Sequence, residues 1–313
     1  TLKDAGYNTA HIGKCHYAPV PYSQTQPDKT LPYEKFRDYY LTLGIDHLDL
    51  QDDKQVSVWF YDDYAQELDD AGYLKAYRDA TWDKSNRKVF GFPGPAEWHP
   101  DSWVGRKAVE YVDNYQDQDP LFMWVSFSGP HYPFDAPAQY YDRVDMSADR
   151  RIYDEHEFDD PSRIHSATYH GQPTGAIDGM GVAPDRATKN YTEAYWQDLR
   201  RSYFANVAQI DDYVGRILKS VEAQFGDNVL IIFTADHGEM LGNHGLWGKN
   251  NCAFEDVWNI PLIARYPRVN TPHVSEEKVM LVDILPTCLK VAGTDYTFCD
   301  GLPLHERIES GGA

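Results

Sequence analysis

Residues 229–238 read Val-Leu-Ile-Ile-Phe-Thr-Ala-Asp-His-Gly, so an apolar run is followed at once by a carboxylate, an imidazole and a glycine. A short and nearly continuous apolar run predicts a β-strand that is buried on both faces. The preceding residues 204–225 carry apolar side chains at steps of three and four, which predicts an amphipathic helix. A helix, a buried strand and a polar loop in this order are typical of an α/β fold.

The same order of elements occurs elsewhere in the chain. Residues 103–116 show helical spacing and are followed by an apolar run at 121–127, which predicts a second buried strand. Further strands are expected at residues 8–12 and 260–266, and a last helix at residues 283–291. This repetition implies a mostly parallel central sheet with helices on both faces.

Composition limits the classes of partner. The chain has 313 residues and a formal net charge of -20, from 29 Lys and Arg against 49 Asp and Glu. Such a chain repels nucleic acid and anionic membranes, and no stretch reaches the roughly 20 apolar residues of a membrane span. We therefore expect no nucleic-acid partner and no membrane span. An anionic substrate would require positive charge focused locally, by a metal ion or by clustered Lys and His.

Polar side chains follow three of the expected strands. Lys14 and His16 come after the first strand, His131 after the second, and Asp236 and His237 after the third. In open parallel sheets ligands bind beyond the carboxyl ends of the strands, so we expect these side chains to share one rim. A carboxylate and an imidazole can ligate one divalent cation, although a strand-end Asp can also simply cap a helix.

Two neighbouring donors after the first strand suit a tetrahedral oxyanion, because alternation points Lys14 and His16 to the same side. Lys249 ends a polar, glycine-rich loop and could place an ammonium against an anion held at the metal; the alternative is a surface lysine. His131 lies between two prolines that would hold a general acid in place, or it is a turn histidine that packs on Tyr132.

Other segments are interpreted as surroundings of this rim. The acidic tract at residues 52–70 is expected to be a solvated helical excursion, and residues 171–181 a mobile glycine-rich surface loop. Aromatic side chains between residues 58 and 103 either stack on sugar rings or belong to the core. The four cysteines form no Cys-x-x-Cys pair, which gives little support to a zinc or redox site. Localisation and oligomeric state stay open.

Four segments resemble the type I sulfatase family, and they occur in the family's order. Residues 2–16 are similar to its second signature region, with Cys15 where members usually have Trp. Residues 127–134 resemble the family's Pro-His-x-Pro-Phe segment, and residues 233–249 its metal-binding strand end and lysine loop. Residues 282–287 are similar to the helix after the last core strands.

The resemblance implies an alkaline-phosphatase-like α/β sandwich, with residues 1–313 forming a single sulfatase-like catalytic domain. It implies hydrolysis of a sulfate ester, of a sulfated carbohydrate or a small aryl sulfate. Asp236 and His237 would ligate Ca²⁺ or Mg²⁺, Lys14, His16 and Lys249 would contact the sulfate, and His131 would assist the leaving group.

The chain also departs from the family pattern. The Cys-x-Pro-Ser-Arg or Ser-x-Pro-Ser-Arg motif, whose first residue matures to formylglycine, does not occur in it. Residues 1–7 read as the last turn of a helix, so we expect a domain that is incomplete at its N terminus, with much of the C-terminal subdomain absent. The isolated chain should then be inactive. Two alternatives remain: a phosphodiesterase or phosphonate monoester hydrolase of the same superfamily, and a non-catalytic vestigial homologue.

Overall fold

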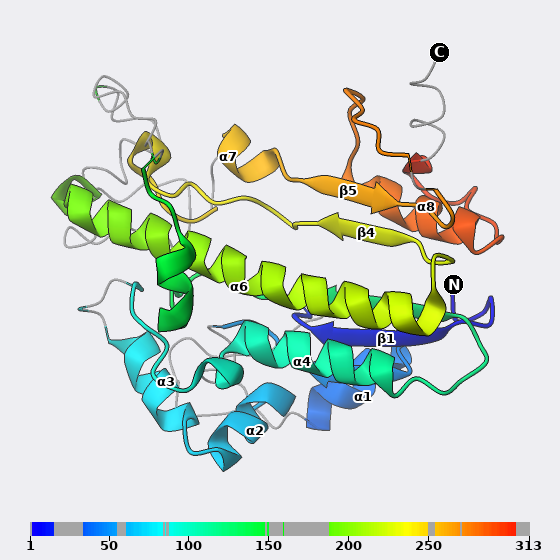
Figure 1. Ribbon diagram of the computed structural model, residues 1–313, viewed down its shortest axis with the longest axis horizontal. Helices are drawn as coiled ribbons and strands as arrows, with labels where there is room; N and C mark the ends of the chain where they lie inside the picture. Colours follow the sequence, from blue (N-terminus) through cyan, green and yellow to red (C-terminus); the bar gives the residue numbers. More distant parts are fainter. Residues whose placement is uncertain are drawn as a thin grey trace.

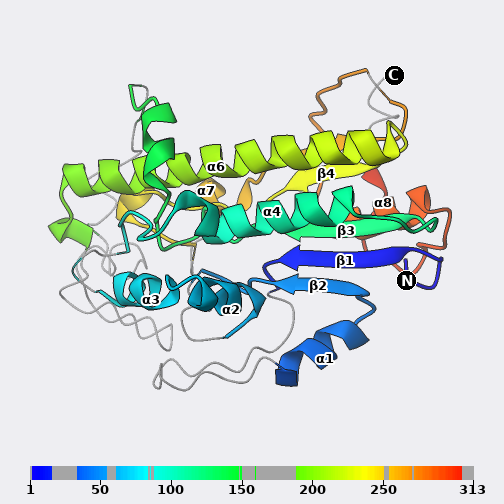
Figure 2. The ribbon, with the colours of Figure 1, turned by 60° about the horizontal axis from the view of Figure 1, so that its bottom comes forward.

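The computed structural model describes residues 2–15, 34–54, 61–83, 85, 88–147, 149, 159, 188–249, 254–269 and 271–304. His16 and the glycine-rich piece at 171–181 lie outside the described residues. Figures 1 and 2 show a layered α/β molecule in which the long helix α6 (Glu193–Phe225) runs beside α4 (Pro100–Asp113). None of the described helices is long and apolar enough to cross a membrane.

A three-stranded parallel sheet forms the first half of the core. Its order is β2-β1-β3, with β1 (Asn8–Gly13) in the middle, β2 (His47–Leu50) on one side and β3 (Leu121–Ser126) on the other. Ala10 is paired with His47 and with Met123, and every residue of β1 after Asn8 is buried. The strands expected at 8–12 and 121–127 are thus confirmed, together with a mostly parallel α/β fold.

The strands β4 (Ile231–Thr234) and β5 (Leu262–Arg265) form a separate antiparallel pair, with Ile231 opposite Arg265. The strand after residue 228 is therefore present, but its neighbour runs the other way. In the described part of the connection the helical elements are the 3₁₀ turn η8 (Asn243–Gly245) and the short helix α7 (Glu255–Trp258), and neither is long enough to carry the chain back across the sheet for a parallel crossover.

The predicted helices correspond closely to observed ones. The helix expected at 204–225 is the C-terminal part of α6, whose first turn is capped by Thr192 through the amide of Tyr195. The helix expected at 283–291 is α8 (Ile284–Val291). The remaining elements are α1 (Glu34–Thr42), α2 (Asp63–Asp70), α3 (Leu74–Trp82) and the 3₁₀ turns η3 (Ala96–Trp98), η4 (Ala138–Arg143), η7 (Thr188–Asn190), η8 (Asn243–Gly245) and η9 (Leu281–Asp283).

The main core lies between the parallel sheet and the helices that pack on it. It joins Ile12 of β1 to apolar side chains of α2, α3, α4 and α6, and several aromatic side chains of the 58–103 stretch belong to it. Tyr64, Tyr77 and Trp103 are fully buried, so these three serve the core and are not free to stack on a sugar ring. Burying apolar surface on this scale is the main source of stability of the fold.

The acidic tract at 52–70 is not the solvated excursion that its composition indicates. Asp52, Asp53 and Asp62 are buried. Asp62 accepts a hydrogen bond from the amide of Ala65 at 2.8 Å, as the N-cap of α2, and another from the amide of Asp52 at 2.9 Å. The carboxylate of Asp62 is drawn inward because it satisfies backbone donors that burial would otherwise leave unpaired. Only the later part, α2, presents acidic side chains to solvent.

Candidate active site

Lys14 leaves the sheet at the end of β1, at a point set by close backbone packing. Gly13 has a φ of 106°, and a Cβ there would lie 2.0 Å from the carbonyl oxygen of Ser126 on β3. The amide of Lys14 donates to that same oxygen at 2.8 Å. Only glycine fits this approach. The side chain of Lys14 is 7% exposed, and its Nζ lies 3.2 Å from Oδ2 of Asp236.

Asp236 and His237 follow β4 in a turn that is fixed against α7. The amide of Gly238 donates to the carbonyl of Val257 at 2.8 Å, and a Cβ on Gly238 would lie 1.8 Å from the carbonyl oxygen of Asp256. The Oδ2 atom of Asp236 is 3.5 Å from Nε2 of His237. Sequence neighbours whose side chains point to the same place can act on one ligand.

The tautomer of His237 follows from its contacts. Its Nδ1 lies 2.7 Å from the carbonyl oxygen of Gly238, which can only accept, so Nδ1 carries the proton. The lone pair of Nε2 is then directed at Nζ of Lys249, 2.6 Å away. A ring anchored through one nitrogen to a backbone carbonyl, with the other nitrogen available, is the arrangement of metal-bound histidines. Here an ammonium group occupies the position next to that nitrogen.

The electrostatics of these groups reflect two ammonium groups held close together. Burial lowers the pKa of Lys249, and the nearby charge of Lys14 lowers it further. Burial also lowers the pKa of His237. Burial by itself would raise the pKa of Asp236, but the charges of Lys14 and then His237 lower it below the ordinary value. The cluster therefore keeps an ionised carboxylate beside two cationic side chains.

His131 lies in the loop after β3. Its ring stacks on Tyr132, with ring centroids 4.2 Å apart, and its Nδ1 donates to the Tyr132 carbonyl oxygen at 2.8 Å. Its centroid is also 6.0 Å from that of His237. Burial lowers the pKa of His131 to about 4, although the charge of Asp53 acts to raise it. His131 thus packs on Tyr132 and also lies beside His237.

Asp53 is a member of this site that the sequence reasoning missed. Its side chain is 3% exposed; Oδ2 lies 3.8 Å from Nζ of Lys14, and Oδ1 lies 3.9 Å from Nδ1 of His131. The signal was available, because Asp53 follows the carboxyl end of β2, which is a strand of the same parallel sheet. The acidic composition of residues 52–70 instead favoured a solvated segment.

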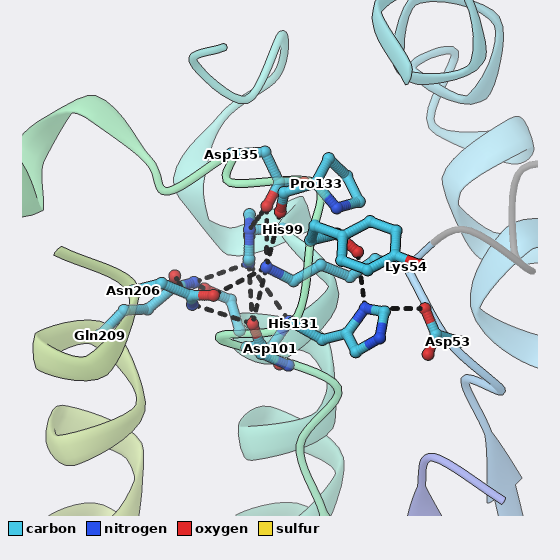
Figure 3. A network of polar contacts seen from close by, with 12 residues as sticks. Asp53, Lys54, His99, Asp101, His131, Pro133, Asp135, Asn206 and Gln209 are labelled. Atoms are coloured by element: carbon cyan, nitrogen blue, oxygen red, sulfur yellow. Dashed lines mark hydrogen bonds and ion pairs between the residues drawn. The ribbon is translucent and has the colours of Figure 1, made fainter. Parts of the chain in front are cut away.

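A second set of polar side chains lies directly behind the His131 loop (Figure 3). We call it the buried network. It comprises six residues whose side chains are almost or fully inaccessible: Lys54, His99, Asp101, Asp135, Asn206 and Gln209. Its members come from the segment after β2, from α4 and its N-cap residue His99, from α6 and from the loop after β3, and no sequence motif connects them.

The sequence-predicted residues converge, with one lying outside the described part of the chain. We call Lys14, His131, Asp236, His237 and Lys249 the site cluster; its members are linked by the contacts given above. His16 lies outside the described residues. The strand ends that carry Lys14 and Asp236 are 222 residues apart in the chain, yet their side chains are in contact.

The donor set of the site cluster suits a divalent cation in part. Asp236 offers a carboxylate, and His237 offers the unprotonated ring nitrogen that Lys249 contacts in this structure. Within the described ranges, no group of three or more His, Cys, Asp or Glu side chains is placed to hold a metal ion. Ca²⁺ takes six to eight ligands and Mg²⁺ about six. Asp236 and His237 therefore fit as two ligands of a larger coordination sphere.

Two lysines and two histidines, with carboxylates among them, thus gather after the ends of β1, β3 and β4 in a fold that belongs to the alkaline-phosphatase-like class. A family model described as Sulfatase matches residues 1–294, and the chain belongs to this family.

Known proteins agree with this assignment. The chain is 27% identical over 295 residues to an uncharacterized sulfatase of Escherichia coli (strain K12), covering 93% of this chain and 51% of that protein. It is 25% identical over 221 residues to an arylsulfatase of Clostridium perfringens, covering 67% and 42%. A phosphonate monoester hydrolase from Silicibacter pomeroyi shares the fold, with a TM-score of 0.68 at 21% identity, covering 97% of this chain and 59% of that one. The chain thus spans about half the length of the curated relatives it matches.

Proposed function

We propose that this chain forms the sulfate-binding and metal-binding part of a sulfuric ester hydrolase, with residues 1–313 belonging to one catalytic domain. The observation that carries the proposal is the convergence of Lys14, Lys249 and His131 on the turn that holds Asp236 and His237. Membership of the sulfatase family supports the same reaction. The alternative reaction is hydrolysis of a phosphodiester or a phosphonate monoester.

The ammonium groups of Lys14 and Lys249 bind the sulfate group in this proposal. Both can donate hydrogen bonds to its oxygens and offset its charge, in a protein whose net charge of -20 would otherwise repel it. Lys14 is almost buried, so its electrostatic interactions are screened less than those at the surface. His16 is proposed as a third contact to the sulfate.

His131 is proposed to protonate the leaving oxygen. With its Nδ1 donating to the carbonyl of Tyr132, it presents Nε2 to the reaction. Its low pKa makes it neutral in the ligand-free site. A bound anion favours the protonated ring and raises that pKa toward the range in which a general acid is effective.

Asp236 and His237 would hold a divalent cation, which we propose to be Ca²⁺ or Mg²⁺. When bound, such a cation supplies Lewis-acid stabilisation of charge on the ester oxygens. The lysines next to both residues would turn from their carboxylate and imidazole partners to the anion. The nucleophile is proposed to be a formylglycine that is not encoded in these 313 residues, because the sequence has no Cys-x-Pro-Ser-Arg or Ser-x-Pro-Ser-Arg motif.

A sulfated sugar or a small aryl sulfate is the proposed substrate. One fold relative, with a TM-score of 0.60, was solved in complex with D-glucosamine-2-N,6-O-disulfate, and a relative from Bacteroides thetaiotaomicron is an N-acetylglucosamine-6-O-sulfatase. Those names describe the relatives. The sulfated glucosamines in those names are the first compounds to test as substrates of this protein.

The test uses the product of the complete reading frame that contains this chain, assayed with 4-nitrophenyl sulfate, bis(4-nitrophenyl) phosphate and a 4-nitrophenyl phosphonate monoester. We expect the sulfate to have the highest kcat/KM, and Lys249→Ala to lower it by about 10²-fold. Lys75→Ala, on the exposed face of α3, is the matched control and should change nothing. A dominant phosphodiesterase or phosphonate rate would overturn the proposal in favour of the alternative. The 313-residue chain assayed by itself should show no turnover.

A further inference from the structure

The centre of the buried network is the ammonium group of Lys54, which is fully inaccessible to solvent. Nζ donates to Oδ1 of Asp135 at 2.8 Å and to Oδ1 of Asn206 at 2.7 Å, and it lies 3.8 Å from Oδ2 of Asp101 (Figure 3). An isolated charge in such a place is strongly disfavoured, and these three oxygen partners make it tolerable. A lysine that is held this completely has a fixed position.

The same network binds the His131 loop on both sides of the histidine. Before it, the amide of Gly129 donates to Oδ1 of Asp101 at 2.8 Å. After it, the carbonyl oxygen of Pro133 accepts from Lys54 at 3.4 Å, and Asp135 accepts from Lys54. The loop also lies very close to the network, because a Cβ on Gly129 would be 2.2 Å from Oδ2 of Asp101. His131 is the midpoint of a segment tied down at each end.

Lys54 also fixes the residue before it in the chain. Asp53 places its carboxylate between Nζ of Lys14 and Nδ1 of His131, at 3.8 Å and 3.9 Å. Because the side chain of Lys54 is anchored in the network, the backbone that carries Asp53 is anchored too. Figure 3 shows Asp53 and the buried network on opposite sides of the His131 ring.

The remaining members hold the anions of the network in place. Gln209 donates to Nδ1 of His99 at 3.0 Å, so that nitrogen accepts and the other ring nitrogen donates to Asp135 at 3.3 Å. Asn206 donates to Oδ2 of Asp101 at 2.9 Å. Each carboxylate that touches the His131 loop is thus oriented by at least one further side chain.

We propose that Lys54 is a positioning residue for His131: one buried ammonium binds the segment after His131 directly, holds the segment before it through Asp101, and fixes, through Asp53, the carboxylate beside the ring. This inference rests on the proposed function, in which His131 protonates the leaving oxygen. A group that only supports the fold affects all substrates alike. A group that positions the proton donor matters most for substrates whose leaving group is a strong base.

The experiment measures kcat and KM for aryl sulfates with leaving-group pKa values from about 5 to about 10, using the product of the complete reading frame. The variants are Lys54→Met and the charge-balanced double variant Lys54→Met with Asp135→Asn, which should fold more readily. His131→Ala is the reference for lost proton donation. Arg200→Met is the matched control, because it removes a cation that is also buried, at 4% exposure, but whose partners are Asp149 and Glu193.

We expect His131→Ala to lower kcat by about 10²-fold or more for the poorest leaving group and only a few-fold for the best. Both Lys54 variants should show the same steepened dependence, by at least about tenfold across the series, with KM nearly unchanged. Arg200→Met should keep the wild-type dependence. If the Lys54 variants aggregate, Asn206→Ala removes one partner of Nζ while keeping both ion pairs, and it should show a weaker version of the same change.

Three other outcomes would overturn the inference, and each can be told apart from the others. A uniform loss of kcat across the series in the Lys54 and Asn206 variants would overturn the positioning role and leave the proposed function intact. If the dependence of kcat on leaving-group pKa were unchanged in His131→Ala, His131 would not be the proton donor. The positioning role of Lys54 would then be overturned as well. Absence of sulfate-ester turnover by the wild-type protein would overturn the proposed function first.

Discussion

The His131 loop lies between two clusters of charged side chains that differ in how their charges are arranged. In the buried network, Lys54 faces Asp101 and Asp135, and amide side chains supply the remaining hydrogen bonds. In the site cluster, two lysines crowd the one turn that carries Asp236 and His237. The first cluster resembles a completed hydrogen-bond network, whereas the second holds two ammonium groups so close together that the charge of one lowers the pKa of the other, although Asp236 and Asp53 both lie beside Lys14.

The pKa values describe the same contrast. Asp135 is deeply buried, which by itself raises its pKa, yet the charge of Lys54 and then His99 lowers it to about 2. In the site cluster, the pKa of Lys249 is lowered by burial and by the charge of Lys14. Paired charges stabilise each other in the first case, and like charges oppose each other in the second. The contrast teaches that a cluster in which like charges are held close together is a candidate binding site for a group of the opposite charge.

The largest effect we expect is on stability, and it comes from breaking the buried network. Lys54→Met leaves two buried carboxylates without their cation, which should lower the free energy of unfolding by about 3–5 kcal/mol. Urea or thermal denaturation measures this loss. The matched control is Lys75→Ala, which breaks an exposed ion pair with Asp79 whose side chains are 85% and 66% accessible. It should cost less than about 0.5 kcal/mol. Equal losses for the two variants would contradict a structural role of the buried network.

The next effect is on activity, with stability nearly unchanged. Asp236→Asn keeps the size of the side chain but removes one proposed metal ligand, so kcat/KM should fall by about 10³-fold and the affinity for divalent metal should weaken. Calorimetric titration with Ca²⁺, Mg²⁺ and Mn²⁺ and a chromogenic sulfate assay measure the two quantities. Asp198→Asn on the exposed face of α6 serves as the control. A loss of several kcal/mol of stability would mean that Asp236 belongs with the structural network.

The sequence was sufficient for much of the fold and for the site cluster. A buried strand that ends in Asp236 and His237 can be predicted from local apolar pattern, and the rule on strand ends brings Lys14 and His131 to the same rim. The antiparallel direction of β5 could not be predicted from helix and strand order, because the helical elements in the described part of the connection, η8 and α7, have only 3 and 4 residues. The functional roles of the predicted residues remain predictions.

The buried network could not be predicted from local sequence patterns, and the reason is physical. Lys54 and Asn206 are 152 residues apart, and each by itself looks like an ordinary polar residue of a loop or a helix. A buried lysine is rare enough that sequence reasoning assigns such residues to the surface. Asp53 could have been found, because it follows the end of β2, but the acidity of the surrounding tract favoured a solvated segment.

The smallest effect we expect is a gain in stability. It concerns Asp52, a buried carboxylate that belongs to neither cluster. Asp52 lies next to Asp53 and is fully buried, and neither oxygen of its carboxylate has a hydrogen-bond partner in the described part of the chain. Burial, together with the charges of Asp62 and Asp53, raises its pKa well above the ordinary value. Burial therefore disfavours the ionised form of Asp52, whereas the charges of Lys54 and His99 overcome this effect for Asp135.

A carboxyl group whose pKa is raised by folding stabilises the folded state only while it is protonated. Its ionisation opposes folding as the pH rises from the unfolded pKa, near 4, toward the raised folded value. Asp52→Asn removes the ionisation, so it should leave stability unchanged in acid and increase it by about 1 kcal/mol at neutral pH. Denaturation midpoints of both proteins between pH 4 and pH 8 measure the difference. If the gain were the same at every pH, neutral packing of the new side chain and not the buried charge would be its cause.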